Sequence, residues 1–150
     1  MIEPMYFEDF AVGQITEAGP VTVSEADIIE FGRQFDPQPM HVDPAAAATI
    51  TGGLIASGWH TASLTMRLLV TGRHYQPEPG TEGLGFDALK WLKPVRPGDA
   101  LRLRVELLAV RASTSKPGWG IITNQMITLN QHGEPVQEMR SSAIVPMRNK

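Results

Sequence analysis

The stretch that decides the fold is SGWHTASLTMRLLVTG, residues 57–72. It begins with a serine, a common helix N-cap, and ends with Gly72, a residue type that often follows a helix C-terminus. Apolar side chains occupy most of the helix circumference between them: Trp59, Ala62, Leu64, Met66, Leu68, Leu69 and Val70. A helix that is apolar on most sides is buried. We therefore predict a buried helix from Ser57 to about Thr71 that packs against a sheet.

The sequence after this helix predicts the sheet. Residues 101–107 alternate between apolar and charged side chains, as in a half-exposed strand. Further strands are expected near residues 83–95, 120–130 and 136–147. Short turn sequences separate the strands: PGD at 97–99, KPG at 116–118 and HGE at 132–134. Strands joined by short turns form an antiparallel sheet, so the chain is predicted to have an α+β fold.

The sequence before the buried helix contains shorter signals. A short strand is expected at residues 21–23, and Ser24 is placed to cap a helix that runs to about Phe35. This helix must end there, because Asp36 precedes a proline and is pushed out of the helical region. Asp43 and Pro44 then form an N-cap and first-turn pair for another helix, which ends at Gly52-Gly53.

Composition limits the class of protein. At 150 residues the chain can bury about 68–70% of its unfolded surface, and we expect one domain over residues 1–150. A net charge of −3 without a basic run argues against a nucleic-acid partner. The apolar segment at 59–70 is too short to cross a membrane, and the first residues do not read as a signal peptide. The absence of cysteine excludes disulfides and thiolate catalysis. We expect a soluble, cytoplasmic protein.

Two neighbouring segments carry candidate chemistry, DPQPMH at residues 36–41 and GLIASG at 53–58. The first supplies the carboxylate of Asp36 and the imidazole of His41, which can exchange a proton near neutral pH. The second leads into the predicted buried helix, whose first backbone N–H groups could face a substrate carbonyl at Gly58. Together they favour proton chemistry next to a thioester or ester carbonyl.

Spacing alone leaves other interpretations open. Asp-Pro is a frequent turn starter, a single loop histidine is often a bystander, and Ser57 can be a plain N-cap. His41, Asp43 and His60 could supply metal ligands, although no complete metal-binding spacing is present, and we predict no metal site. An extended chain would separate the Cα atoms of Asp36 and His41 by about 15 Å, so their loop must curl if both act on one substrate.

The chain resembles the MaoC-like (R)-specific enoyl-CoA hydratases of the hotdog superfamily. The family signature Gly-Asp-x-Asn-Pro-Leu-His-x-Asp is similar to residues 35–43, FDPQPMHVD, at Asp36, Pro39, His41 and Asp43. Residues 53–58 resemble the family's entry to its central helix, and WLKPVRPGD at 91–99 resembles its motif before the next strand. The three motifs occur in the right order, and the resemblance covers about residues 6–147.

The resemblance implies a hotdog fold, in which a curved antiparallel sheet wraps a long central helix, and a homodimer or an assembly of dimers. It implies no cofactor beyond the CoA or carrier-protein arm of an acyl thioester substrate. By carry-over, Asp36 and His41 hold the water that adds to C3 of a trans-2-enoyl thioester, and the Gly58 N–H binds the thioester oxygen. A further set of residues is expected at the substrate: Gln38, Ser57, Ile55 and Trp59.

Two departures from the signature bear on this expectation. Gln38 stands where the family has Asn, and Gln34-Phe35 replace a small residue and a glycine. Neither departure removes a catalytic group, so we predict a working hydratase or dehydratase. A hotdog acyl-CoA thioesterase and a non-catalytic acyl-thioester binding subunit remain the alternatives.

Overall fold

The computed structural model describes residues 3–73, 76–77 and 80–149. Its main feature is a five-stranded antiparallel sheet with the strand order β2-β5-β6-β7-β4. The strands of this sheet are β2 (Ile15–Thr22), β4 (Glu82–Trp91), β5 (Ala100–Ala112), β6 (Trp119–Leu129) and β7 (Pro135–Pro146). Two short strands, β1 (Pro4–Met5) and β3 (Gln76–Pro77), pair separately in parallel. The predicted α+β class is confirmed.

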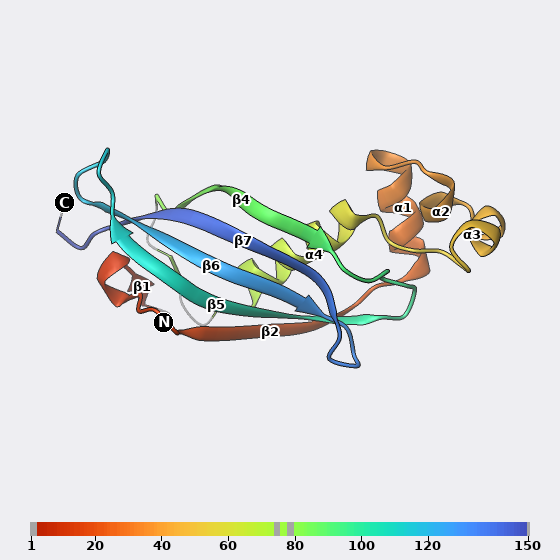
Figure 1. Ribbon diagram of the computed structural model, residues 1–150, viewed down its shortest axis with the longest axis horizontal. Coiled ribbons are helices and arrows are strands. Elements are labelled where there is room, and N and C mark those ends of the chain that lie inside the picture. Colours follow the sequence, from red (N-terminus) through yellow and green to blue (C-terminus); the bar gives the residue numbers. More distant parts are fainter. Residues whose placement is uncertain (1–2, 74–75, 78–79, 150) are drawn as a thin grey trace.

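The helices occupy two places relative to the sheet (Figure 1). The longest, α4 (Gly58–Thr71), lies along the sheet. A cluster of three helices lies beyond the end of the sheet from which α4 starts: α1 (Glu25–Phe35), α2 (Pro39–Val42) and α3 (Pro44–Ile50). A 3-10 turn, η1 (Phe7–Asp9), lies near the N-terminus. None of the helices in the described ranges is long and apolar enough to span a membrane.

The predicted helix starts are confirmed by their caps, whereas α3 ends at Ile50, before the predicted Gly52-Gly53. Ser24 Oγ accepts a hydrogen bond from the Asp27 N–H at 3.1 Å. Asp43 accepts from two backbone N–H groups at the start of α3. The end of α4 at Gly72 has a further cause, because a Cβ atom there would lie 2.3 Å from the Cβ of Ala18. A glycine at this position therefore lets the helix end approach β2 closely.

Two strand predictions need correction. The strand expected at residues 21–23 begins earlier, at Ile15, and ends at Thr22, with a register irregularity between Ala18 and Val21. The strand expected to continue to Val95 ends at Trp91. Val95 instead lies in a loop, where its carbonyl accepts a hydrogen bond from the Ala56 N–H at 2.8 Å. That bond ties the loop after β4 to the residues just before α4.

The prediction that α4 is buried on most sides is wrong. Trp59, Met66 and Val70 are 56%, 39% and 53% exposed, whereas the buried positions of this helix are largely polar. The buried residues are His60, Thr61, Thr65 and Leu68. The helix lies with one face on the sheet, and the Thr65 hydroxyl on that face bonds both to the helix backbone at the Thr61 carbonyl and to Thr128 of β6. Composition gave the number of apolar side chains but not the face that meets the sheet.

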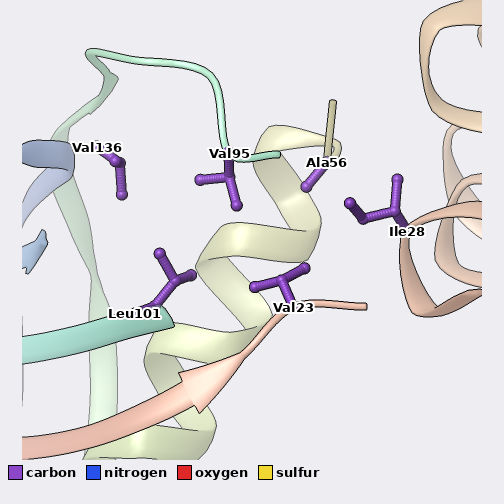
Figure 2. Packing of buried hydrophobic residues seen from close by; sticks show 6 residues of the cluster. All are labelled: Val23, Ile28, Ala56, Val95, Leu101 and Val136. Atoms are coloured by element: carbon purple, nitrogen blue, oxygen red, sulfur yellow. The ribbon is translucent and has the colours of Figure 1, made fainter. Parts of the chain in front are cut away.

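One hydrophobic cluster fixes the start of α4 (Figure 2). Its buried side chains come from α1, β5, β7 and the loops around them: Val23, Ile28, Ala56, Val95, Leu101 and Val136. Ala56 immediately precedes the N-cap of α4, so its packing anchors the first turn of the helix. A second cluster joins α4 to the middle of the sheet through Leu68 and Met126. The first turn of α4 is therefore held at a defined place relative to α1 and β7.

Candidate active site

The loop after α1 curls as the candidate chemistry requires. Pro39 begins α2, a single helical turn, and its fixed φ angle suits this first position. The turn brings His41 back toward Asp36, and the distance between His41 Nε2 and Asp36 Oδ2 is 3.3 Å. Two groups that an extended loop would separate thus form a close pair. The sequence showed the two residues but not the helical turn that joins them.

The hydrogen bonds of His41 define its protonation pattern. Its Nδ1 lies 2.7 Å from the carbonyl oxygen of Ile55. Because a carbonyl oxygen only accepts, Nδ1 carries the proton in this contact. In the neutral ring Nε2 is therefore free to accept a proton, next to the Asp36 carboxylate. The ring is 5% exposed and lines the pocket described below.

Asp36 is held as a carboxylate by its neighbours. Burial acts to raise the pKa of Asp36, but hydrogen bonds from Gln38 and Ser57 and the charge of His41 outweigh it, so that the pKa is lowered. The Gln38 amide donates to Oδ1 at 2.8 Å. The Ser57 hydroxyl donates to Oδ2 at 2.7 Å. Oδ2 is thus shared between Ser57 and the imidazole of His41, which leaves an anion beside a proton acceptor.

Ser57 has two roles. As the N-cap of α4, its Oγ accepts a hydrogen bond from the Trp59 N–H at 3.3 Å, which confirms the capping interpretation. The same hydroxyl donates its single proton to Asp36. The side chain is buried, and it contacts both the Asp36 carboxylate and the first turn of α4. Ser57 therefore connects α4 to the loop that carries Asp36.

A pocket of about 260 Å³ lies beside this pair. Its lining includes His41, Ile55, Gly58, Thr61 and Trp91. Gly58 is the first residue of α4, so its N–H has no partner within the helix. A proton-exchanging histidine and a free helix N-terminus thus face one space. This arrangement can hold a small carbonyl compound close to a proton acceptor.

The other predicted substrate residues are distributed unevenly. Ile55 lines the pocket and fixes His41 through its carbonyl group. Gln38 contacts Asp36 and is exposed. Trp59 does not line the pocket; its indole lies edge-on to that of Trp91, with the ring centroids 5.2 Å apart. Of the candidates, Asp36, His41, Ser57, Gly58, Ile55 and Gln38 are brought together.

His60 lies apart from this group. Its ring stacks on Phe31, with centroids 4.7 Å apart and planes 7° from parallel. Burial lowers the pKa of His60 below its ordinary value of 6.5; Asp27 acts to raise the pKa and Arg67 to lower it. Within the described ranges, no three His, Cys, Asp or Glu groups lie together as metal ligands.

Several residues of the pocket region were missed, and Trp91 and Gln137 are the two whose contacts are best defined. Trp91 lies against Gly58, and Gln137 of β7 accepts a hydrogen bond from its indole N–H at 2.9 Å. Trp91 and Gln137 both belong to strands, where an aromatic or an amide gives no signal of a site. A glycine at the first position of a helix was the available hint, because it indicates a close neighbour.

Comparisons with known proteins agree on one family. The model of the MaoC like domain matches residues 9–129. A MaoC-like dehydratase from Rhodospirillum rubrum is 43% identical with a TM-score of 0.86, and the alignment covers 97% of this chain and 99% of that one. The (R)-hydratase PhaJ1 from Pseudomonas aeruginosa is 27% identical with a TM-score of 0.78, over 98% and 89% of the two chains.

A third comparison bears on the fold alone. The protein Rv0216 from Mycobacterium tuberculosis, described as a double hotdog fold, is 22% identical with a TM-score of 0.79. The alignment covers 98% of this chain and 46% of that one. The predicted hotdog architecture, with a curved antiparallel sheet around α4, is confirmed.

Proposed function

The chain belongs to the MaoC-like domain family, and from that premise we propose that it is an (R)-specific enoyl-CoA hydratase. The reaction adds water reversibly across the C2–C3 double bond of a trans-2-enoyl thioester and gives a (R)-3-hydroxyacyl thioester. The observation that carries the proposal is the pair of His41 Nε2 and Asp36 Oδ2, 3.3 Å apart, beside a pocket that also contains Gly58.

The proposed mechanism assigns one task to each group. A water held between Asp36 and His41 loses a proton to Nε2, and its oxygen forms a bond to C3. The Asp36 carboxylate stabilises the imidazolium that results. Electrons move from the double bond toward the thioester oxygen, where the Gly58 N–H stabilises the developing enolate. The His41 imidazolium then gives its proton from Nε2 to C2, so that the elements of water have been added and the enzyme is unchanged.

A turnover assay tests the proposal. Mixing crotonyl-CoA with the purified protein should lower the absorbance of the enoyl thioester, and Asp36→Asn or His41→Ala should each abolish the change. His132→Ala, at an exposed turn, is the matched control and should keep full activity. Because the chain has no cysteine, a thiol reagent would detect released CoA without background. Thiol release would favour the thioesterase alternative, and tight binding without turnover would favour the binding subunit.

The proposed substrate is an acyl-CoA or acyl-carrier-protein thioester, and the proposed location is the cytoplasm. We also propose a homodimer. β4 is an edge strand of the sheet, and exposed apolar side chains lie on α4 and β4, among them Met66 and Phe86 around one hollow. Apolar edges of this kind are usually covered. Light scattering should give twice the chain mass; Phe86→Glu should halve it, and the exposed Val12→Glu should not.

A further inference from the structure

The indole of Trp91 forms a wall of the pocket directly against Gly58. A Cβ atom built on Gly58 would lie 2.2 Å from Cε2 and 2.4 Å from Cδ2 of Trp91. No side chain fits at this position while the indole stays in place. The ring therefore fills the space beside the first turn of α4, on the side where it faces the pocket. A bound molecule must fit beside this ring.

A buried chain of hydrogen bonds holds the indole. Trp91 Nε1–H donates to Gln137 Oε1 at 2.9 Å, and Gln137 Nε2–H donates to Thr65 Oγ1 at 3.1 Å. Gln137 is 1% exposed. An indole nitrogen only donates, so the oxygen of the Gln137 amide must face Trp91 and the nitrogen must face Thr65. The orientation of the amide is thereby fixed.

The far end of this chain is also closed. Thr65 Oγ1 donates to the Thr61 carbonyl at 2.9 Å and lies 2.6 Å from Thr128 Oγ1, which leaves Thr128 to donate to Thr65. Each of these four contacts thus pairs one donor with one acceptor. Moving the indole would leave the buried carbonyl oxygen of Gln137 unpaired, which is costly. Trp91 is 47% exposed, yet its position is set from inside the sheet.

We propose that Trp91 limits the length of the acyl group, and that Gln137 acts as a positioning residue through it. This inference rests on the proposed function, because it treats the pocket as the acyl site. The pocket volume of about 260 Å³ lies below the range of about 300–1,000 Å³ typical of pockets for drug-sized ligands. On this inference, short enoyl groups fit beside the fixed indole better than long ones.

The test compares chain-length profiles. We would measure kcat/KM for trans-2-enoyl-CoAs of four, six, eight and ten carbons with the unchanged protein, Trp91→Leu and Gln137→Met. Trp119→Leu, which removes a tryptophan at the far end of β6, is the matched control. Trp91→Leu should raise the ratio of the eight-carbon to the four-carbon kcat/KM by about tenfold or more, the scale of discrimination by a hydrophobic pocket. Gln137→Met should shift the ratio in the same direction by less.

A binding measurement separates this inference from the proposed function. Calorimetry with butyryl-CoA and octanoyl-CoA, which cannot be hydrated, reports acyl length without turnover. A shift toward octanoyl-CoA in Trp91→Leu supports the inference even if no enoyl-CoA is hydrated, an outcome that would overturn only the hydratase assignment. An unchanged ratio in folded Trp91→Leu, or no acyl-CoA binding by the unchanged protein, would overturn the inference.

Discussion

His41 and His60 are almost equally buried, at 5% and 6% exposure, but their surroundings differ. Both ring nitrogens of His41 face polar atoms, the Ile55 carbonyl and the Asp36 carboxylate. His60 stacks on Phe31, and its buried Nδ1 has no hydrogen-bond partner within the described residues. Only His41 lines the pocket. Burial therefore does not distinguish His41, the proposed catalytic histidine, from His60; the groups that the ring nitrogens face do.

The two regions differ because of what the chain places next to each ring. The α1–α2 loop places the Asp36 carboxylate beside His41. Gln38 from that loop and Ser57, the N-cap of α4, both donate hydrogen bonds to this carboxylate. α1 offers His60 an aromatic face. The carboxylate of Asp36 lies 3.3 Å from His41 Nε2, whereas burial of His60 favours its neutral form. The first environment suits proton transfer, and the second suits packing.

The largest expected effect comes from replacing His41 by phenylalanine, and the same substitution at His60 is the comparison. His41→Phe removes the proton acceptor and should lower kcat/KM for enoyl-CoA hydration by about 10²–10⁴-fold, the range for general acid–base catalysis. His60→Phe keeps an aromatic ring against Phe31 and should leave kcat/KM close to that of the unchanged protein. Steady-state kinetics of both variants checks the pair. A large loss in folded His60→Phe would remove the distinction between the two regions.

A smaller effect is expected from Ser57→Ala, which cuts the link between Asp36 and α4. The lost N-cap should lower the free energy of unfolding by about 0.5–2 kcal/mol. The Asp36 carboxylate also loses a donor, so kcat should fall. Ser63→Ala is a matched control, because its hydroxyl donates to the Trp59 carbonyl on the exposed side of the same helix. Urea unfolding and kinetics measure both effects; equal behaviour of the two variants would contradict the role given to Ser57.

Much of the fold was predictable from local sequence. Ser24, Asp43 and Ser57 mark helix starts because a capping side chain acts within three residues of itself. The alternation in β5 is equally local, and the buried positions predicted at Leu101 and Leu103 are confirmed. These features depend on short-range chemistry, which a single sequence displays directly.

The rest depended on contacts distant in the sequence. α2 is one turn long, too short for periodicity to indicate it. The face of α4 that meets the sheet depends on where the sheet lies, and this reversed the expected burial of Trp59. The bond from Trp91 to Gln137 joins residues 46 positions apart. The candidate pair of Asp36 and His41 was visible in the sequence, but its geometry and the Trp91 wall were not.

The third prediction concerns the pH dependence of the free energy of unfolding and the contribution of His60 to it. The pKa of His60 is lowered in the folded protein, chiefly by burial, so the unfolded chain binds the proton more tightly. The free energy of unfolding should therefore be fully maintained above pH 6.5 and should fall as the pH drops from 6.5 toward the lower folded pKa. His60→Phe should remove this component. Chemical unfolding at a series of pH values from neutral to mildly acidic measures the difference; parallel curves for the two proteins would contradict it.

The smallest expected effect comes from Gln38→Ala and concerns the pKa of Asp36, the carboxylate beside His41. The Gln38 amide donates to Asp36 Oδ1 at 2.8 Å and helps to lower the pKa of Asp36. Gln38→Ala should raise that pKa toward its ordinary value of 3.8. Gln34→Ala removes a comparable exposed bond, to Glu30, and is the control.

The same change has a consequence for stability. The lowered pKa means that the Asp36 carboxylate stabilises the fold above pH 3.8 and that this stabilisation is lost as the pH falls through the folded pKa. Gln38→Ala should reduce the contribution, because the folded and unfolded pKa values move closer together. A carbon-13 titration of the Asp36 carboxyl group measures the pKa directly. An unchanged Asp36 pKa in Gln38→Ala would show that Ser57 and His41 alone hold this carboxylate in its charged form.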